Sequence, residues 1–155
     1  MKRKLLAALP VGLYLQLRRW DYKRAHRVQF NHLQQLRNMT TEDGYSFKPL
    51  DVKQAIFVHI PKCAGVSINK AIFGCLGGGH TTFDEYLNVF EPVCIMNYFK
   101  FTIVRNPWSR LVSAYSFLNN GGFNSNDSEW FRQELGHFHD FDDFVISFTQ
   151  TDHQT

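Results

Sequence analysis

Two stretches of the chain join an apolar run to a short loop that carries a cation. In residues 55–72 the apolar run AIFVHI precedes the loop PKCAGVS, and in residues 100–119 the run KFTIV precedes RNP and the segment WSRLVSAYSFLNN. Each stretch has the pattern of a buried strand, a tight loop and the first turns of a helix. Two such units with a lysine and an arginine at their strand ends predict a site for a doubly phosphorylated ligand.

The loop PKCAGVS has the residue types of an anion cradle. Where a strand ends in a loop that enters a helix, backbone N–H groups converge on one spot and the helix dipole adds positive charge. Gly65 permits close approach to the backbone, Lys62 supplies a full charge, and Ser67 supplies a hydroxyl and a predicted helix cap. Because the lysine precedes the glycine, the loop is not a Walker A motif. The alternative is an ordinary strand–turn–helix with an incidental lysine.

The second loop, RNPWSRLVSAY, offers a pair of groups for another phosphate. Arg105 ends the apolar run, and Ser113 follows it by eight residues, about two helical turns. In a straight helix this offset returns to nearly the same face, and a guanidinium with a hydroxyl suits a phosphate. Trp108 and Tyr115 are predicted to be packing residues. For Arg110 two roles are open: a second phosphate contact or a surface charge.

Composition indicates a folded domain, and the charge of the chain is unevenly distributed. The length of 155 residues suits one domain, and a hydrophobic content of 44% excludes global disorder. Residues 1–39 hold nine Lys/Arg and one acid, whereas the remainder holds eight Lys/Arg and thirteen acids. A basic arm is therefore attached to a mildly acidic body, and it suits an anionic membrane surface or a polyanion. A solvated basic helix is the alternative.

The three cysteines, Cys63, Cys75 and Cys94, have no metal-binding spacing. This pattern favours reduced or buried thiols over a disulfide scaffold. The alternating His137 and His139 lack a third ligand, so no metal site is predicted.

The apolar run near the N-terminus is about 13 residues, shorter than the roughly 20 residues that span a bilayer. A basic start before an apolar run is also typical of a signal peptide, but Pro10 interrupts the run and no small-residue cleavage site follows. We therefore predict an amphipathic or interfacial helix over residues 11–37, with a shortened membrane anchor as the alternative.

The rest of the pattern predicts an α/β fold. Residues 1–40 form the helical arm and residues 41–54 a polar linker. Strands are expected at residues 55–60 and 101–104, and residues 93–96 are ambiguous, with a short strand as one interpretation. Helices are expected at residues 67–74, 83–90, 108–118, 128–135 and 141–148, with Ser128 capping the fourth.

HIPKCAGVS followed by FTIVRNPWSRLVSAY resembles the paired signature of sulfotransferases that use 3′-phosphoadenosine 5′-phosphosulfate (PAPS), in particular family 2. That group includes Golgi carbohydrate sulfotransferases and many bacterial relatives. The resemblance covers about residues 55–150 and implies a P-loop NTPase-like parallel sheet flanked by helices. Because catalytic domains of this family are usually considerably longer, residues 55–155 are expected to be the N-terminal part of one, in an incomplete chain.

The resemblance also implies roles for individual residues. Lys62 would stabilise the leaving phosphate, and His80, after a glycine run, would be the base, as uronyl 2-O-sulfotransferases carry a Gly-His at this place. The alternative for His80 is an ordinary loop histidine, and His59 is predicted to be a core or supporting residue. The 5′ end of PAPS would contact Lys62, Cys63, Ala64, Gly65, Val66 and Ser67, and its 3′-phosphate Arg105 and Ser113.

The resulting hypothesis is sulfuryl transfer from PAPS, without a metal, to a hydroxyl that the family implies to be on a carbohydrate. The alternatives are a non-catalytic protein on a sulfotransferase fold and a small kinase, which Mg²⁺-dependent ATP turnover would support. The expected partners are a hydroxyl acceptor and, through the basic arm, a membrane surface, but no nucleic acid. The expected location is cytoplasmic or membrane-associated, or the Golgi in a eukaryote.

Overall fold

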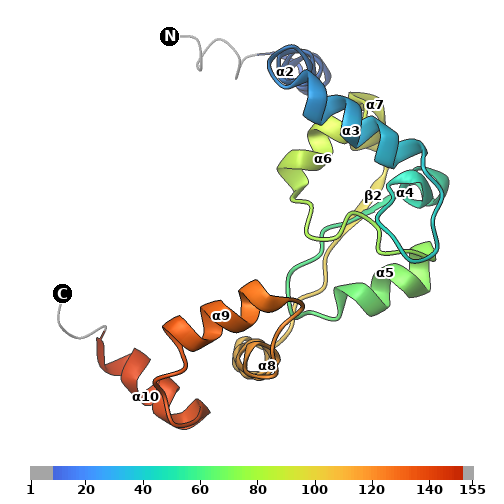
Figure 1. Ribbon diagram of the computed structural model, residues 1–155. Helices are drawn as coiled ribbons and strands as arrows, with labels where there is room; N and C mark the ends of the chain where they lie inside the picture. Colours follow the sequence, from blue (N-terminus) through green and yellow to red (C-terminus); the bar gives the residue numbers. More distant parts are fainter. Residues whose placement is uncertain (1–8, 152–155) are drawn as a thin grey trace. The chain divides into compact units, whose positions relative to one another are not determined.

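The computed structural model describes residues 9–151 and divides the chain into two compact units. The first unit ends at Val104, and the second begins at Arg105. Figure 1 labels the helices of both units and strand β2 of the first. The basic cluster at residues 2–4 and the last four residues lie outside the described part of the chain.

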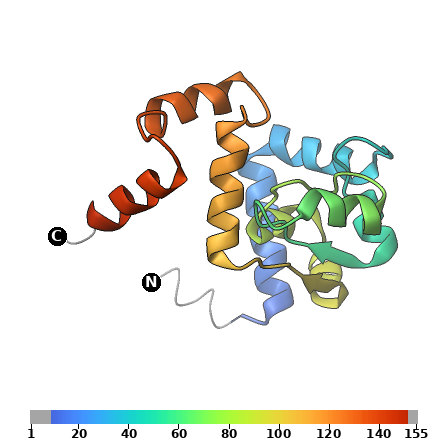
Figure 2. The ribbon, with the colours of Figure 1, turned by 90° about the horizontal axis from the view of Figure 1, so that it is seen from below.

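The sheet of the first unit consists of two parallel strands, β1 (Ala55–Phe57) and β2 (Phe99–Phe101). The ladder continues beyond β1, because the N–H of Val58 donates to the C=O of Phe101 at 3.0 Å. Parallel strands need a long crossover connection, and here it is mostly helical. It contains α5 (Gly65–Phe73), α6 (Phe83–Val89) and α7 (Pro92–Asn97). Figure 2 shows α5 running beside the strands. The mixed helix and sheet character that the sequence predicts is confirmed.

The strands differ from the prediction in length and burial. β1 ends at Phe57, three residues early, and β2 ends at Phe101, where the predicted second strand begins. Ile103 and Val104 are exposed, although their β-branched side chains suggested a buried strand. Within residues 9–151, β2 is hydrogen-bonded only to β1 and is therefore an edge strand. The strand interpretation of residues 93–96 is wrong, because Pro92 begins helix α7 there.

The single helix predicted for the N-terminal arm is two helices, α2 (Val11–Ala25) and α3 (Arg27–Asn38). His26 separates them with a φ of −129° and a ψ of 53°, which is not helical. Both helices contact α6. The bend therefore lets Leu15 of α2 and Phe30 of α3 each bury an apolar side chain.

The polar stretch predicted as a linker is packed into the first unit. It contains α4 (Lys48–Lys53), which has Pro49 in its first turn and ends at Gln54 in the left-handed region. Phe47 and Leu50 are buried in the core. These two apolar side chains anchor the segment in the core although its composition is mostly polar.

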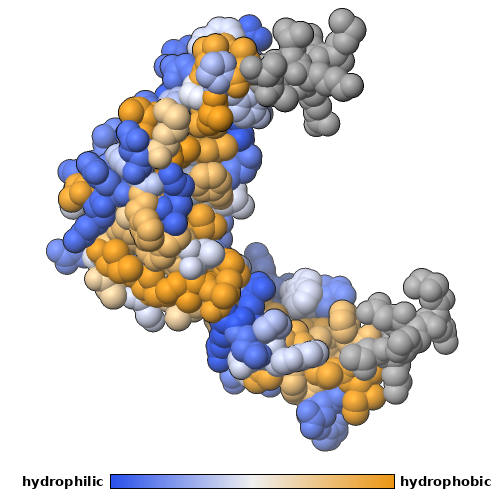
Figure 3. Space-filling view, turned by 180° about the vertical axis from the view of Figure 1, so that it is seen from behind, coloured by the Kyte–Doolittle hydropathy of each residue, from blue (hydrophilic) through white to orange (hydrophobic). Residues whose placement is uncertain are grey.

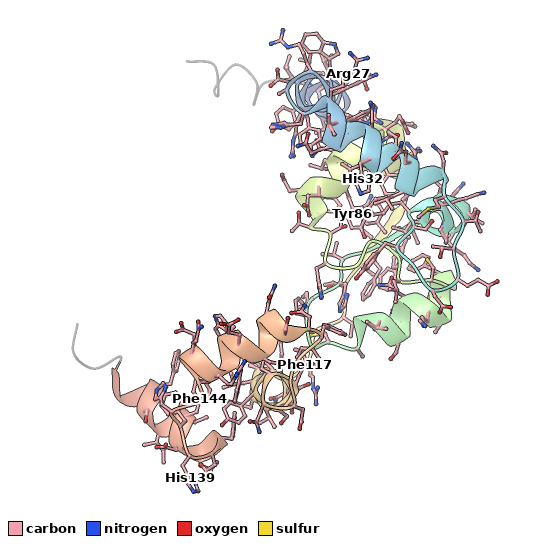
Figure 4. All side chains as sticks on the ribbon, viewed as in Figure 1. Arg27, His32, Tyr86, Phe117, His139 and Phe144 are labelled. Carbon is pink, nitrogen blue, oxygen red and sulfur yellow. The ribbon has the colours of Figure 1, made fainter. Side chains whose placement is uncertain are left out.

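The core of the first unit is aromatic in its centre. The ring of Tyr86 lies edge-on to Phe47 and stacks on Phe90, and its hydroxyl donates to the C=O of Phe57 at 3.3 Å. Figure 4 shows Tyr86 inside the unit, below α3. Together with Phe57, these side chains bring α4, β1 and α6 into one core: Leu15, Phe47, Leu50, Ile56, Phe57, Phe73, Cys75, Tyr86, Val89, Phe90 and Ile95.

The second unit contains three helices, α8 (Pro107–Asn119), α9 (Ser125–Glu134) and α10 (Phe141–Thr151). Asn124 caps α9, so the predicted cap at Ser128 is wrong. Ser128 lies within the helix, and its hydroxyl donates to the C=O of Gly121 at 2.7 Å. The hydroxyl thus fixes the preceding turn and does not cap the helix.

Aromatic side chains hold the second unit together. Tyr115 contacts the rings of Phe131, Phe141 and Phe144 at centroid distances of 5.2–5.6 Å, which confirms its packing role. Trp108, by contrast, is exposed, so its predicted packing role is not seen. A largely apolar cavity of about 800 Å³ lies beside Tyr115, between α8, α9 and α10.

A network of ion pairs fastens α3 to the rest of the first unit. Arg37 pairs with Asp51 and with Glu91, each at 2.6 Å, and Arg19 reaches Glu91 at 3.1 Å. Burial by itself would raise the pKa of Glu91, but the hydrogen bond from Arg37 and both guanidinium charges hold that pKa below its ordinary 4.5. This contribution to stability is present above about pH 4.5 and is lost as the pH falls through the lowered pKa.

We expect Arg37→Ala to lower the free energy of unfolding by about 2–3 kcal/mol, because it leaves Asp51 and Glu91 charged without their main partner. Urea denaturation followed by circular dichroism measures the loss. The control is Arg18→Ala, which removes a pair with Asp84, a carboxylate that is 75% exposed, and should cost less than about 1 kcal/mol. Equal losses in the two variants would contradict the role given to the network.

Candidate functional site

The loop between β1 and α5 has an unusual backbone. Lys62 and Ala64 have φ values of 66° and 60°, in the left-handed region that residues other than glycine rarely adopt. In the described part of the chain, Gln54 is the only other non-glycine residue with a positive φ. Such strain costs about 1–3 kcal/mol per residue and is concentrated at ligand-binding sites. Backbone geometry therefore marks this loop as a candidate site.

Helix α5 begins at Gly65, so the predicted cap at Ser67 is wrong. Ala64 occupies the cap position, and no side chain caps this helix. The N–H of Ile68 bonds to the C=O of Ala64 at 3.1 Å, as in a regular first turn. The N–H groups of Gly65, Val66 and Ser67 precede it and have no acceptor within the helix. These groups and the positive end of the dipole make the start of α5 suitable for an anion.

Cys63 has a different position from the other loop residues. Its side chain is buried, and its N–H donates to the C=O of Ile60 at 3.2 Å. The thiol of Cys63 is thus covered, and its N–H is used within the turn. Lys62 is half-buried, whereas Ala64, Val66 and Ser67 are exposed.

His59 packs directly against the start of α5. Its ring is buried and lies so close to Gly65 that a Cβ at that position would overlap the ring. Gly65 is therefore required by His59, a reason that the sequence did not indicate. The Nδ1 atom of His59 has no hydrogen-bond partner among the described residues.

The electrostatic environment keeps His59 uncharged. Burial lowers its pKa, and the neighbouring His80 lowers it further, although a hydrogen bond with the backbone of Gly79 acts in the opposite direction. A histidine whose pKa is below the ordinary 6.5 is neutral at neutral pH. The imidazole of His59 therefore adds no positive charge beside the loop.

His80 lies next to His59. The two ring centroids are 4.4 Å apart and the ring planes are inclined by 32°. His80 is exposed and follows a glycine turn in which Gly77 and Gly79 both have a φ of 58°. Since only glycine adopts this conformation without strain, the turn determines where the chain presents His80. Through His59, the structure brings His80 and the start of α5 to one place.

Asn69 is a supporting residue that the sequence reasoning missed. It is buried, and a Cβ at Gly77 would come within 2.5 Å of its Oδ1 atom. Asn69 therefore joins α5 to the glycine turn before His80. The spacing in the sequence could have indicated its burial. Gly65, Asn69 and Phe73 are four residues apart and form the buried face of α5.

Arg105 and Ser113 belong to the second unit. Arg105 is exposed, and Asn106 after it caps α8 by accepting N–H bonds from Trp108 and Ser109 at 3.0 and 3.3 Å. Ser113 is half-buried in the middle of that helix. Because Arg105 precedes the helix, the argument that an eight-residue offset places both residues on one face does not hold. Their pairing stays a prediction from the resemblance.

Comparison with family models decides the identity of the chain. A model described as the sulfotransferase family matches residues 46–153, which is well over half of the sequence. The chain belongs to the sulfotransferase family. Searches of curated proteins and of solved structures gave no significant match.

Two further properties of this sulfotransferase concern metals and membranes. In residues 9–151, no three His, Cys, Asp or Glu side chains gather where they could hold a metal ion. Over the same residues, no helix combines the length and the apolar character that a bilayer span requires.

In this sulfotransferase, Gly65→Ala should destabilise the fold by about 1–3 kcal/mol, because the added methyl group overlaps His59. A double-mutant cycle tests the cause. In a His59→Ala background the ring is absent, so the same substitution should cost at least about 1 kcal/mol less.

The matched control for this cycle is Gly12→Ala in α2, where the nearest atom to an added Cβ is Met96 Cε at 3.5 Å. That substitution should be neutral or slightly stabilising, since alanine favours a helix over glycine by about 1 kcal/mol. If Gly65→Ala behaves like the control, or costs the same with and without His59, the contact is not what requires the glycine.

Proposed function

We propose that this domain transfers a sulfuryl group from PAPS to a hydroxyl group of a carbohydrate. The observation that carries the proposal is the left-handed backbone at Lys62 and Ala64, directly before a helix without a side-chain cap. Family membership supports sulfuryl transfer. PAPS as donor, and a P-loop NTPase-like sheet as the architecture, are inferred from the sequence signature.

The loop suits the phosphosulfate end of the donor. Backbone N–H groups at the start of α5 can donate to its oxygens, and the ammonium of Lys62 supplies the compensating charge. Arg105 and Ser113 would hold the 3′-phosphate, with a guanidinium for charge and a hydroxyl for direction. All of these groups bind anionic oxygen without a metal.

The reaction that we propose has one in-line step. The acceptor oxygen attacks sulfur while the bond between sulfur and the bridging oxygen breaks, and the electron pair of that bond stays on the departing phosphate. Lys62 stabilises the charge that develops there, and His80 takes the proton of the acceptor hydroxyl. The neutral state of His59 matters for this role, because a charged neighbour 4.4 Å away would oppose proton uptake by His80.

A sulfate-transfer assay tests the proposal. The full chain is incubated with PAPS carrying radiolabelled sulfate and with a panel of glycans, and the label is expected on at least one glycan. Binding of the desulfated product PAP without transfer to any acceptor would favour a non-catalytic protein on this fold. Mg²⁺-dependent ATP turnover without sulfate transfer would favour a kinase.

A further inference from the structure

The outer face of α2 is apolar. Leu13, Leu17 and Trp20 are 48%, 41% and 58% exposed, and their spacing of four and three residues places them along one side of the helix. Leu15, on the opposite side, is the buried residue of α2. Figure 3 shows apolar surface at the end of the first unit where α2 lies. An amphipathic helix normally turns its apolar stripe toward the core, so this outward stripe needs an explanation.

Ion pairs hold the stripe in its outward position. Arg18 pairs with Asp84 at 2.6 Å, and Arg19 pairs with Glu91 at 3.1 Å. Both contacts connect α2 to the body of the first unit, and both guanidinium groups are largely covered. Arg18 and Arg19 therefore lie on the inner face of α2, which leaves the apolar residues outside.

A second group of cations lies at the C-terminal end of the stripe. Lys23, Arg24 and Arg27 are exposed, and Figure 4 shows Arg27 at the outer end of the first unit. The guanidinium of Arg24 lies 5.1 Å from the ring centre of Trp20, so charge and apolar surface are continuous. Asp21 is the only acid among residues 9–38. Its separation of 3.9 Å from Arg24 makes that pair weak.

Exposed apolar residues next to exposed cations suit one kind of partner surface. A second copy of the same face would bring two sets of these cations together, and like charges oppose such a contact. An anionic lipid surface instead offers phosphates to the cations and an apolar layer to the leucines. Tryptophan is the side chain that favours the boundary between these two regions.

We propose that α2 docks the protein on anionic phospholipid membranes. Leu13, Leu17 and Trp20 enter the headgroup boundary, and Lys23, Arg24 and Arg27 lie at the lipid phosphates. The helix lies in the plane of the surface without crossing it. This surface is separate from the loop between β1 and α5, and the proposal does not depend on the proposed reaction.

Co-sedimentation of the full chain with lipid vesicles tests the proposal. Vesicles with about 30% phosphatidylserine should bind the protein at least about tenfold more tightly than phosphatidylcholine vesicles, and added salt should weaken that binding. Leu17→Ser combined with Trp20→Ser should reduce the affinity about tenfold, and so should Lys23→Gln combined with Arg24→Gln. The control Val52→Ser changes an apolar residue of α4 that is more exposed than Leu17 or Trp20, at 73%, and should bind like the original protein.

All four changed positions of α2 are exposed, so circular dichroism should show folded protein in each variant. Absence of binding to anionic vesicles overturns the proposal, and so does binding that neither α2 variant weakens. Salt-independent self-association that depends on Trp20, in place of vesicle binding, also overturns it, because the face then serves a second copy.

Discussion

Lys62→Ala should lower kcat for sulfate transfer by about 10²–10³, the usual effect of removing one group that stabilises charge developing in a transition state. The lysine lies in the strained loop before α5, where its charge adds to the N–H groups of that helix. The assay is transfer of labelled sulfate from PAPS at saturating acceptor. The matched control is Lys70→Ala, at the other end of α5, whose partner Asp43 is 91% exposed.

Because Lys62 has a φ of 66°, the effect of its charge must be separated from the effect of its backbone. Lys62→Gly removes the charge and also relieves the strained conformation, since glycine adopts it freely. We expect Lys62→Gly to be as inactive as Lys62→Ala but to be more stable. Activity near the original level in either variant would mean that the ammonium group does not stabilise the leaving phosphate.

His80→Ala should lower kcat by about 10²–10⁴, the range expected when a general base is removed. The affinity for PAP should change less than about twofold, because the base contacts the acceptor and not the nucleotide. The pH dependence of kcat that a general base imposes should be lost in the variant. His139→Ala, which changes an exposed histidine of the second unit, is the control and should keep both the rate and the pH profile.

A different result would reassign the histidines. If His80→Ala keeps its activity, His80 is an ordinary loop residue held against His59 by its ring contact. If PAP binding and kcat fall together, the side chain supports the start of α5 through His59 and does not act as the base.

The strand–loop–helix at residues 55–73 was predictable because its signals are local. A strand, a lysine, a glycine and a helix within 18 residues indicate the strand–loop–helix that the structure contains at β1 and α5. The helix at residues 107–119 was predictable for the same reason, since Pro107 suits its first turn. The cap was not predictable, because Ser67 is the better capping residue by type but Ala64 occupies the position.

Burial was harder to predict, because it depends on what packs against a residue. Ile103 and Val104 have the side chains of a buried strand but follow an edge strand. Phe47 is surrounded by polar residues in the sequence but lies in the core. The contact of His59 with Gly65 and His80 depends on the orientation of a ring and on the path of a glycine turn, which no pattern of residue types records.

Binding of PAP to the full chain, measured by calorimetry, tests the central claim most directly, because it requires no acceptor. We predict binding that weakens at least about tenfold in Lys62→Ala and in Arg105→Ala, since each removes a charged contact to one end of the nucleotide. Lys70→Ala should bind as the original protein does. Absence of binding, or affinities unchanged in both Lys62→Ala and Arg105→Ala, would contradict the assignment of these residues to a PAPS site.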